Sequence, residues 1–256
     1  MEKDRPSSPV LGLILARGGS QSIPKKNIAL CAGKPLLYYT IQAALRSRLI
    51  TRLCISTDSE EIASYARDNG VEVPYMQPSE LATGTTPDLP VFQYAVKWFE
   101  ENESYCPSVI VHLRPTTPLK KSDDIDRAIA LLMENPEAHS VRSVCEPMHT
   151  PFKMYRRVEE SPYLRPILAR EFPEVYLQYP EAFNMPRQVL PTLWRHSGYV
   201  DSLRPDVIRA GSMSGSNILP FEIEKWRDVD IDTKRDLIYA EIIIRELEAQ
   251  GKNPWD

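Results

Sequence analysis

Residues 13–27 read LILARGGSQSIPKKN, an apolar run that changes into a loop with two glycines and three cations. The first four residues are typical of a buried strand. Arg17-Gly18-Gly19-Ser20 would then turn sharply and expose successive backbone N–H groups, to which Arg17 and Lys26 can add positive charge. Such concave turns bind phosphate groups. We therefore expect a phosphate-binding loop, and a solvated loop is the alternative.

The loop matches neither of the common glycine motifs for phosphate groups. It contains no G-x-G-x-x-G and no G-x-x-x-x-G-K-[ST]. These are the patterns of dinucleotide-binding folds and of Walker loops. A dinucleotide oxidoreductase and a Walker-type site are therefore disfavoured.

Strand-like runs and helical patterns alternate on both sides of the loop. This order predicts an α/β fold with a doubly wound, mainly parallel sheet that is covered on both faces. Ligands bind such sheets in the loops at the carboxyl ends of the strands. The predicted strands are residues 10–15, 53–57, 71–75, 108–113 and 138–145, and the predicted helices are residues 36–45, 60–68, 88–101, 125–134 and 233–250.

Proline becomes frequent and clean periodicity ends at about residue 146. We interpret residues 146–202 as a small arm or subdomain within a single domain of residues 1–256. A segment of this composition is not expected to build a core of its own. We therefore expect it to be buried on a second copy of the chain, in a homodimer.

The bulk composition excludes several classes of protein. The chain has 31 Lys and Arg residues against 35 Asp and Glu residues, a net charge of −4 that gives no electrostatic footprint for nucleic acid. The four cysteines have no metal-ligand spacing. No segment resembles a signal peptide, and no run approaches the roughly 18 apolar residues of a membrane span. We expect a soluble, cytoplasmic protein that binds neither nucleic acid nor membrane.

The loop ARGGSQSIPKKN resembles the signature loop of the acylneuraminate cytidylyltransferases, the enzymes that activate sialic-acid-type sugars with CTP. Further segments resemble markers of that family in the same order, and the resemblance extends from Leu11 to about Glu241. Several separated motifs in register are more specific than any one of them. These segments are Ser56-Thr57-Asp58, Pro78-Ser79-Glu80-Leu81-Ala82, Arg114-Pro115-Thr116-Thr117-Pro118-Leu119, Pro186-Arg187-Gln188 and Val229-Asp230-Ile231-Asp232.

The resemblance implies a fold of the nucleotide-diphospho-sugar transferase type with a small dimerisation arm. It also implies a reaction in which a hydroxyl group of an acidic sugar attacks the α-phosphate of CTP and pyrophosphate leaves. In this reaction Arg17, Lys26 and Asp232 would be catalytic. The residues implied in nucleotide binding are Leu15, Ala16, Arg17, Gly18, Gly19, Ser20, Lys26, Asn27, Gln77 and Asp88.

Asp230 and Asp232 are spaced i, i+2, so on a strand their carboxylates point to the same side. Two such carboxylates repel each other unless a divalent cation lies between them. Magnesium binds a few carboxylates together with phosphates and water. Beside a phosphate-binding loop, we expect this pair to bind Mg²⁺. The alternative is a pair of surface acids next to the cap of the last helix.

Several cations and one acid are expected around the acceptor. Arg114 follows a buried strand at the ligand-binding end of the sheet. Its guanidinium could bind a carboxylate of the acceptor, or it could pair with Asp123 or Asp124. The resemblance adds contacts from the arm, whose cations could instead be ordinary interface residues. The expected acceptor contacts are Arg114, Lys153, Arg187, Gln188, Arg195 and Asp201.

Several positions depart from the pattern of the family. Gln21 stands where the family commonly has a lysine, and Arg114 replaces a usual glutamine. Gln77 stands where sialic-acid enzymes tend to carry an arginine, and Asp201 takes the place of an aromatic residue. The added base, Arg114, and the added acid, Asp201, describe a more polar pocket. We therefore do not expect ordinary N-acetylneuraminate to be the acceptor.

Two rival functions remain open. The first is a nucleotidylyltransferase that uses another base, such as GTP, or a non-sialic acceptor such as a sugar phosphate or a small acid, because the positions near the base are altered. The second is a non-catalytic nucleotide-sensing paralogue. Retention of both metal-binding acids counts against a sensor, which need not keep them. A panel of triphosphates with a pyrophosphate assay would separate these functions.

Overall fold

The computed structural model describes residues 8–20 and 22–256, so Gln21 of the opening loop lies outside the described residues. The chain divides into two compact units. The larger unit contains the described residues up to Ser143 together with Ser197–Asp256. The smaller unit contains Val144–His196.

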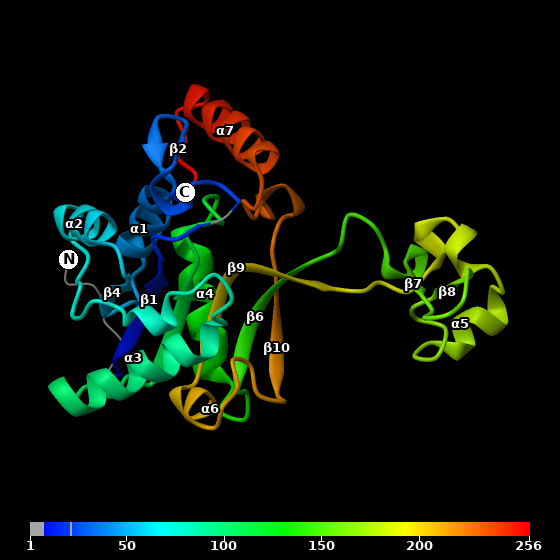
Figure 1. The fold of residues 1–256 in the computed structure, drawn as a ribbon, viewed down its shortest axis with the longest axis horizontal. Helices are drawn as coiled ribbons and strands as arrows, with labels where there is room; N and C mark the ends of the chain where they lie inside the picture. Colours follow the sequence, from blue (N-terminus) through cyan, green and yellow to red (C-terminus); the bar gives the residue numbers. More distant parts are fainter. Residues whose placement is uncertain (1–7, 21) are drawn as a thin grey trace. The chain divides into compact units, whose positions relative to one another are not determined.

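A six-stranded sheet with the order β10-β6-β9-β5-β1-β4 forms the centre of the larger unit (Figure 1). β1 (Val10–Leu15) pairs in parallel with β4 (Arg52–Ser56) on one side and with β5 (Val109–Leu113) on the other. β9 (Arg195–Leu203) runs antiparallel to β5. The predicted α/β class with a mainly parallel sheet is confirmed. The remaining strands are β6 (Ser140–Cys145) and β10 (Ile218–Glu222).

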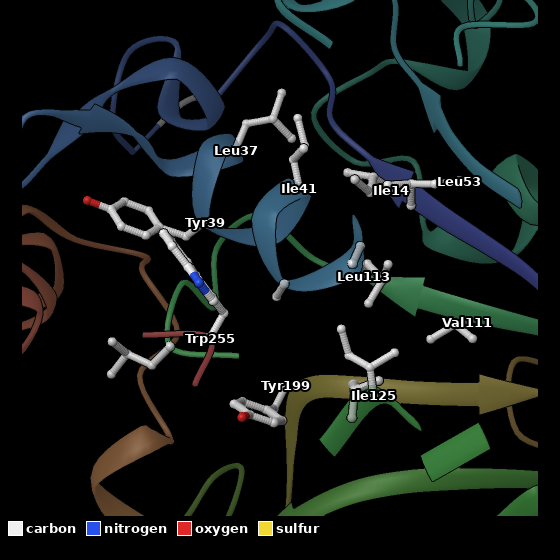
Figure 2. Close-up of a cluster of buried hydrophobic side chains, with 14 of the residues drawn as sticks. Ile14, Leu37, Tyr39, Ile41, Leu53, Val111, Leu113, Ile125, Tyr199 and Trp255 are labelled. Carbon is white, nitrogen blue, oxygen red and sulfur yellow. The ribbon is translucent and has the colours of Figure 1, made fainter. Parts of the chain in front are cut away.

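The two faces of the sheet bury different side chains of β1, because successive residues of a strand point to opposite faces. Val10 and Ile14 lie in one apolar cluster, and Leu11 and Leu13 lie in the other. Figure 2 shows Ile14 within the first cluster. Helices contribute further members to both clusters. They are α1 (Leu36–Arg46), α2 (Glu60–Asp68), α4 (Ser122–Glu134) and α7 (Lys234–Ala249) for the first cluster, and α3 (Asp88–Glu103) and α6 (Pro205–Arg209) for the second.

Local capping chemistry fixes the starts of two helices. Ser59 Oγ accepts a hydrogen bond from the N–H of Ile62 at the start of α2, and Thr233 and Asp236 form a capping box at the start of α7. The five predicted helices occur with ends within three residues of the prediction. In the described parts of the chain, no helix combines the length and the apolar character that crossing a membrane requires.

The strand predicted at residues 71–75 is wrong. Glu72 forms an isolated parallel bridge with Cys54, and the chain then leaves the sheet. Pro74 has no N–H to donate to a neighbouring strand, so pairing ends there. The other short elements of the larger unit are β2 (Leu30–Cys31), β3 (Lys34–Pro35) and 3-10 turns at Lys26–Ile28, Ser79–Leu81 and Lys225–Arg227.

The smaller unit has a small core of its own, contrary to our expectation. Phe152, Val175, Ala182 and Leu190 are buried in one cluster. The unit ends at His196 and not at residue 202, because β9 from Ser197 onwards belongs to the larger unit, where the strand pairs with β5. Its elements are β7 (Tyr155–Arg157), β8 (Leu164–Pro166), α5 (Pro173–Gln178) and 3-10 turns at Pro151–Lys153, Ala182–Asn184 and Arg187–Val189.

Candidate active site

A cavity of about 500 Å³ opens in the larger unit where β1 and β5 end. Leu15 is the last residue of β1, and Arg114 directly follows β5. This is the place at which ligands bind parallel α/β sheets. The expected site residues that line the cavity are Leu15, Arg17, Ser20, Lys26, Asn27, Gln77, Asp88, Arg114 and Asp232.

Hydrogen bonds hold two cations of the opening loop at the cavity. Arg17 Nη1 donates to the Thr83 carbonyl at 2.6 Å. Lys26 Nζ donates to the Ile231 carbonyl at 2.7 Å and lies 3.1 Å from Asp232 Oδ1. Two cations and one carboxylate therefore border the same space, and this arrangement suits a triphosphate with a divalent cation.

We expected several free backbone N–H groups after β1, but two of them already donate hydrogen bonds within the chain. The Gly18 N–H donates to Asp58 Oδ1 at 2.7 Å, and the Ser20 N–H donates to the Gly18 carbonyl at 3.2 Å. A Cβ at Gly18 would lie 3.0 Å from Ser59 Cβ, whereas a Cβ at Gly19 would meet nothing within 4 Å. Packing against α2 thus already requires a small residue at Gly18. A phosphate at its N–H would have to replace the Asp58 carboxylate.

Two neighbours of the loop support it from within. Ala16 is fully buried, and its N–H donates to the Ser56 carbonyl at 3.0 Å, so Ala16 belongs to the core and not to the cavity wall. Asn27 is 8% exposed, and its Nδ2 donates to the Arg17 carbonyl at 2.9 Å. Asn27 therefore ties the two ends of the loop together.

Gln77 forms the wall of the cavity on the β4 side. Its Oε1 accepts a hydrogen bond from Ser56 Oγ at 3.1 Å, and its Nε2 donates to the Leu81 carbonyl at 2.7 Å. The side-chain amide is thus fixed by the surrounding backbone and by β4. Its expected contact with the base stays a prediction.

Arg114 is held by two carboxylates that sequence reasoning did not pair with it. Nη1 lies 2.8 Å from Asp201 Oδ2, and Nη2 lies 3.2 Å from Asp88 Oδ2. Asp123 and Asp124, the partners that we considered, pair with other arginines, so that alternative is wrong. Burial alone would lower the pKa of Arg114, but Asp201 and then Asp88 outweigh burial and raise the pKa.

Contrary to our expectation, Asp201 does not line the cavity. It is fully buried, and its Oδ2 accepts hydrogen bonds from Arg114 Nη1 and, at 3.0 Å, from Arg142 Nη1. A buried carboxylate between two guanidinium groups is stabilised by both and offsets one of their two charges. Asp201 therefore acts on the cavity through Arg114, because it offers no surface of its own to a ligand.

Two buried basic residues near Arg114 were not predicted from the sequence. His112 lines the cavity and is 1% exposed, and Lys120 is fully buried. Lys120 Nζ donates to the Arg114 carbonyl at 2.9 Å and to the Thr117 carbonyl at 2.7 Å, which fixes the loop after β5. Burial, and then the charge of Arg114, lowers the pKa of both side chains well below their usual values. The available signal for His112 was a polar residue near the end of an apolar strand.

Asp230 and Asp232 flank the buried Ile231 in an extended segment that is not a strand. The Ile231 N–H donates to the Thr116 carbonyl at 2.8 Å and fixes the segment beside the loop after β5. The Asp232 side chain is 76% exposed and lines the cavity. Asp230 is half-buried, and its negative charge offsets part of the lowering of the Lys120 pKa. The two acids therefore stand in different surroundings.

In the part of the chain that the structure describes, protein side chains alone do not form a metal site. Over residues 8–20 and 22–256, no group of three or more His, Cys, Asp and Glu side chains could hold a metal ion. The donor at Asp232 nevertheless fits magnesium, which binds through one or two carboxylates and completes its shell with phosphate oxygens and water. Such a site would be completed only by the bound nucleotide.

The remaining expected contacts lie in the smaller unit. Lys153, Gln188 and Arg195 are exposed, and Arg187 forms an ion pair with Glu146 inside the unit. Their expected contacts with the acceptor stay predictions.

Solved structures share this fold at low sequence identity. A CMP:2-keto-3-deoxy-manno-octonic acid synthetase complexed with CTP has a TM-score of 0.65 at 16% identity and covers 93% of this chain and 99% of its own. A 4-diphosphocytidyl-2C-methyl-D-erythritol synthase from Anaerococcus prevotii has a TM-score of 0.61 at 12% identity and covers 93% and 96%. The fold is that of a nucleotidyltransferase. A family model described as cytidylyltransferase matches residues 11–178, and the chain belongs to this family.

Curated relatives have related names. A CMP-N,N'-diacetyllegionaminic acid synthase of Legionella pneumophila is 37% identical over 122 residues, 48% of this chain and 52% of the relative. An N-acylneuraminate cytidylyltransferase of Streptococcus agalactiae is 26% identical over 89% of this chain and 51% of the relative. The chain thus spans about half the length of these two proteins. The post-translational flagellin modification protein B of Campylobacter coli is 27% identical over 96% of this chain and 99% of the relative.

Proposed function

We propose that this protein is a cytidylyltransferase that activates an acidic, nonulosonate-like sugar with CTP and forms a CMP-sugar and pyrophosphate. The observation that carries the proposal is the cavity in which Arg17 and Lys26, from the loop after β1, border the same space as the carboxylate of Asp232. Relatives named for CMP-legionaminic, pseudaminic and acylneuraminic acid synthesis support it.

The reaction forms a bond between a hydroxyl oxygen of the acceptor and the α-phosphorus of CTP. The bond from the α-phosphorus to the oxygen that bridges to the β-phosphate breaks, the hydroxyl proton is released, and charge grows on the departing pyrophosphate. Arg17 and Lys26 are placed to neutralise that charge, so they should contribute more in the transition state than in the ground state. Lys26 is already held by its contacts with Ile231 and Asp232, so little reorganisation is needed.

We propose that Asp232 holds a magnesium ion together with phosphate oxygens of CTP, with Asp230 as a second, more buried carboxylate. The ion would neutralise phosphate charge and orient the triphosphate. The exposure of the Asp232 carboxylate and its position on the cavity support this assignment.

Arg114 must lose one of its two carboxylate partners before it can bind a carboxylate of the acceptor. Both ends of its guanidinium are paired, one with the buried Asp201 and one with Asp88, whose side chain is 46% exposed. An incoming carboxylate would therefore replace Asp88 and not Asp201. Lys153, Arg187, Gln188 and Arg195 of the smaller unit are proposed to add acceptor contacts.

The purified protein should release pyrophosphate when it is given CTP, Mg²⁺ and a nine-carbon acidic sugar. We suggest N,N'-diacetyllegionaminic, pseudaminic and N-acetylneuraminic acids, each with CTP, GTP, UTP and ATP, and mass spectrometry of the CMP-sugar. We expect product with CTP and slower turnover of N-acetylneuraminic acid. Release with GTP or only with a sugar phosphate would favour the rival transferase, and CTP binding without any turnover would favour a nucleotide sensor.

We further propose a cytoplasmic homodimer, with the smaller unit as the dimerisation arm. Its exposed apolar side chains include Met148 and Leu177, both 84% exposed, and Tyr163, 66% exposed. Surface of this kind is stabilised by burial on a partner. The four cysteines of the chain are free, as in a reducing compartment.

Light scattering at micromolar concentration should give twice the chain mass of 29.3 kDa. Leu177→Asp in α5 should shift the mass towards the monomer. Ile238→Asp, at a 60% exposed position of α7 in the larger unit, should leave the dimer intact. A monomeric wild-type protein would reject the proposal.

A further inference from the structure

His112 lies where one face of the sheet changes from apolar to polar. On this face, Ile110 of β5 and Leu203 of β9 belong to the cluster that packs against α3. Two residues further along β5, the register places His112 directly opposite Asp201 of β9. Residues opposite one another in an antiparallel pair share a face. His112 is thus the point at which β5 presents a polar group to the cavity.

The imidazole of His112 is buried, and one of its two nitrogens is unsatisfied in the described part of the chain. The side chain is 1% exposed, and its Nδ1 has no hydrogen-bond partner among the described residues. Its ring rests edge-on against Phe92, with ring centroids 4.7 Å apart. Asp88 Oδ2 lies 3.9 Å from Nδ1, too far for a hydrogen bond. Buried polar groups without partners are costly and rare, so a ligand is the expected partner.

The hydrogen-bonding chemistry of His112 and Asp88 determines which kind of ligand group can bind between them. Burial, and then the charge of Arg114, lowers the pKa of His112 well below its usual value, so the ring is neutral and has one donating and one accepting nitrogen. The Asp88 carboxylate only accepts hydrogen bonds. Nδ1 is itself closed to solvent, so an oxygen atom that bridges the two groups at about 2.8 Å requires the Asp88 carboxylate to move aside. A hydroxyl group fits, because it can accept from the ring and donate to the carboxylate.

The position of His112 favours the acceptor over the nucleotide as the source of this hydroxyl. β1, whose loop carries Arg17 and Lys26, lies between β4 and β5. Gln77 is fixed to β4 on one side of that loop, and His112 belongs to β5 on the other. A nucleotide whose phosphates lie on the central loop and whose base lies towards β4 leaves the β5 side for the acceptor.

We propose that His112 is a specificity-determining residue that, together with Asp88, binds a hydroxyl group of the acceptor sugar, so that Asp88 serves the acceptor and not the nucleotide. This inference rests on the proposed cytidylyltransferase function. The assignment names one contact of the polar pocket, since a sugar without a hydroxyl at that point would leave the buried Nδ1 of His112 without a partner.

Three proteins test the assignment: the wild type, His112→Phe and His112→Asn. Phenylalanine keeps a flat ring against Phe92 and removes both nitrogens, whereas the amide of asparagine places a polar atom close to the position of Nδ1. With the acid of the panel that the wild type uses best, we expect His112→Phe to raise the KM for that acid about tenfold. The kcat should change much less, and His112→Asn should recover most of the loss.

Stability and CTP affinity separate the outcomes. Calorimetric titration with CTP should give wild-type affinity for both variants, and His112→Phe should melt no lower than the wild type, because a costly buried nitrogen is removed. An unchanged KM for the acid in a folded His112→Phe protein would overturn the assignment while the transferase function stands. Weaker CTP binding with an unchanged acid KM would place His112 on the nucleotide and would equally overturn it. Absence of turnover by the wild type with every acid would reject the proposed function, and this inference with it.

Discussion

Asp232→Asn should lower turnover about 100-fold or more while the protein stays folded. The Asp232 side chain is 76% exposed, and asparagine keeps its shape and can still accept a hydrogen bond from Lys26. The substitution removes only the negative charge that is proposed to hold magnesium with the triphosphate. The measurement is kcat at saturating CTP and magnesium, beside a circular dichroism spectrum.

Two further substitutions make the result specific. Asp123→Asn changes an equally exposed carboxylate, 79% exposed, which pairs with Arg48 on the surface, and it should leave kcat unchanged. Asp230→Asn should have a smaller effect than Asp232→Asn, because Asp230 is half-buried and acts on Lys120. Near-normal turnover of Asp232→Asn at saturating magnesium would contradict the assignment.

Local patterns predicted most of the larger unit. The alternation of apolar runs with helical periods identified β1, β4, β5, β6 and five helices, because each apolar stripe faces one of two clusters on the sheet. β10 was missed, since its side chains are mostly exposed and its apolar signal is weak. The strand predicted at residues 71–75 was wrong because a single proline ended the pairing.

Sequence reasoning identified the loop of the site but not the partners of its charges. Arg17, Lys26 and Asp232 line one cavity, although 206 positions separate Lys26 from Asp232. The partners of Arg114 depend on the register between β5 and β9 and on the start of α3, which no local pattern contains. This is why Asp201 was expected in the pocket and is instead buried between two arginines.

In the smaller unit the structure contains a core that the sequence pattern did not predict. Frequent prolines and weak periodicity predicted an arm without a core, yet Phe152, Val175, Ala182 and Leu190 pack together. Residues brought together by turns leave no period to detect. The same irregular segment ends in β9, whose glycine at Gly198 has φ 70° and whose pairing is decided by β5.

Lys26→Ala should lower kcat by roughly two to three orders of magnitude and should raise the KM for CTP much less. Lys26 Nζ is held by the Ile231 carbonyl at 2.7 Å and lies 3.1 Å from Asp232, so its charge is already in place before the reaction. Charge grows on the pyrophosphate as its bond to the α-phosphorus breaks. A fixed cation at this point therefore stabilises the transition state more than bound CTP.

Lys25→Ala is the matched control. The two lysines are adjacent, but Lys25 has a left-handed backbone, with φ 51°, and its Nζ lies 2.6 Å from Glu61. Both partners of this ion pair are more than half exposed, and such pairs contribute about 0–1 kcal/mol to stability. Alanine at this position would adopt the same left-handed backbone conformation as lysine. We therefore expect nearly unchanged kcat and KM.

Steady-state kinetics and calorimetric titration with CTP on both variants distinguish a catalytic cation from a binding cation and from a solvated loop. A loss confined to kcat in Lys26→Ala, with CTP affinity close to that of the wild type, is the expected result. An equal loss of CTP affinity and of kcat/KM would mean that Lys26 only binds the ground state. If Lys25→Ala proved the more damaging, or if neither variant changed catalysis, residues 17–27 would be a solvated turn after the first strand of the sheet.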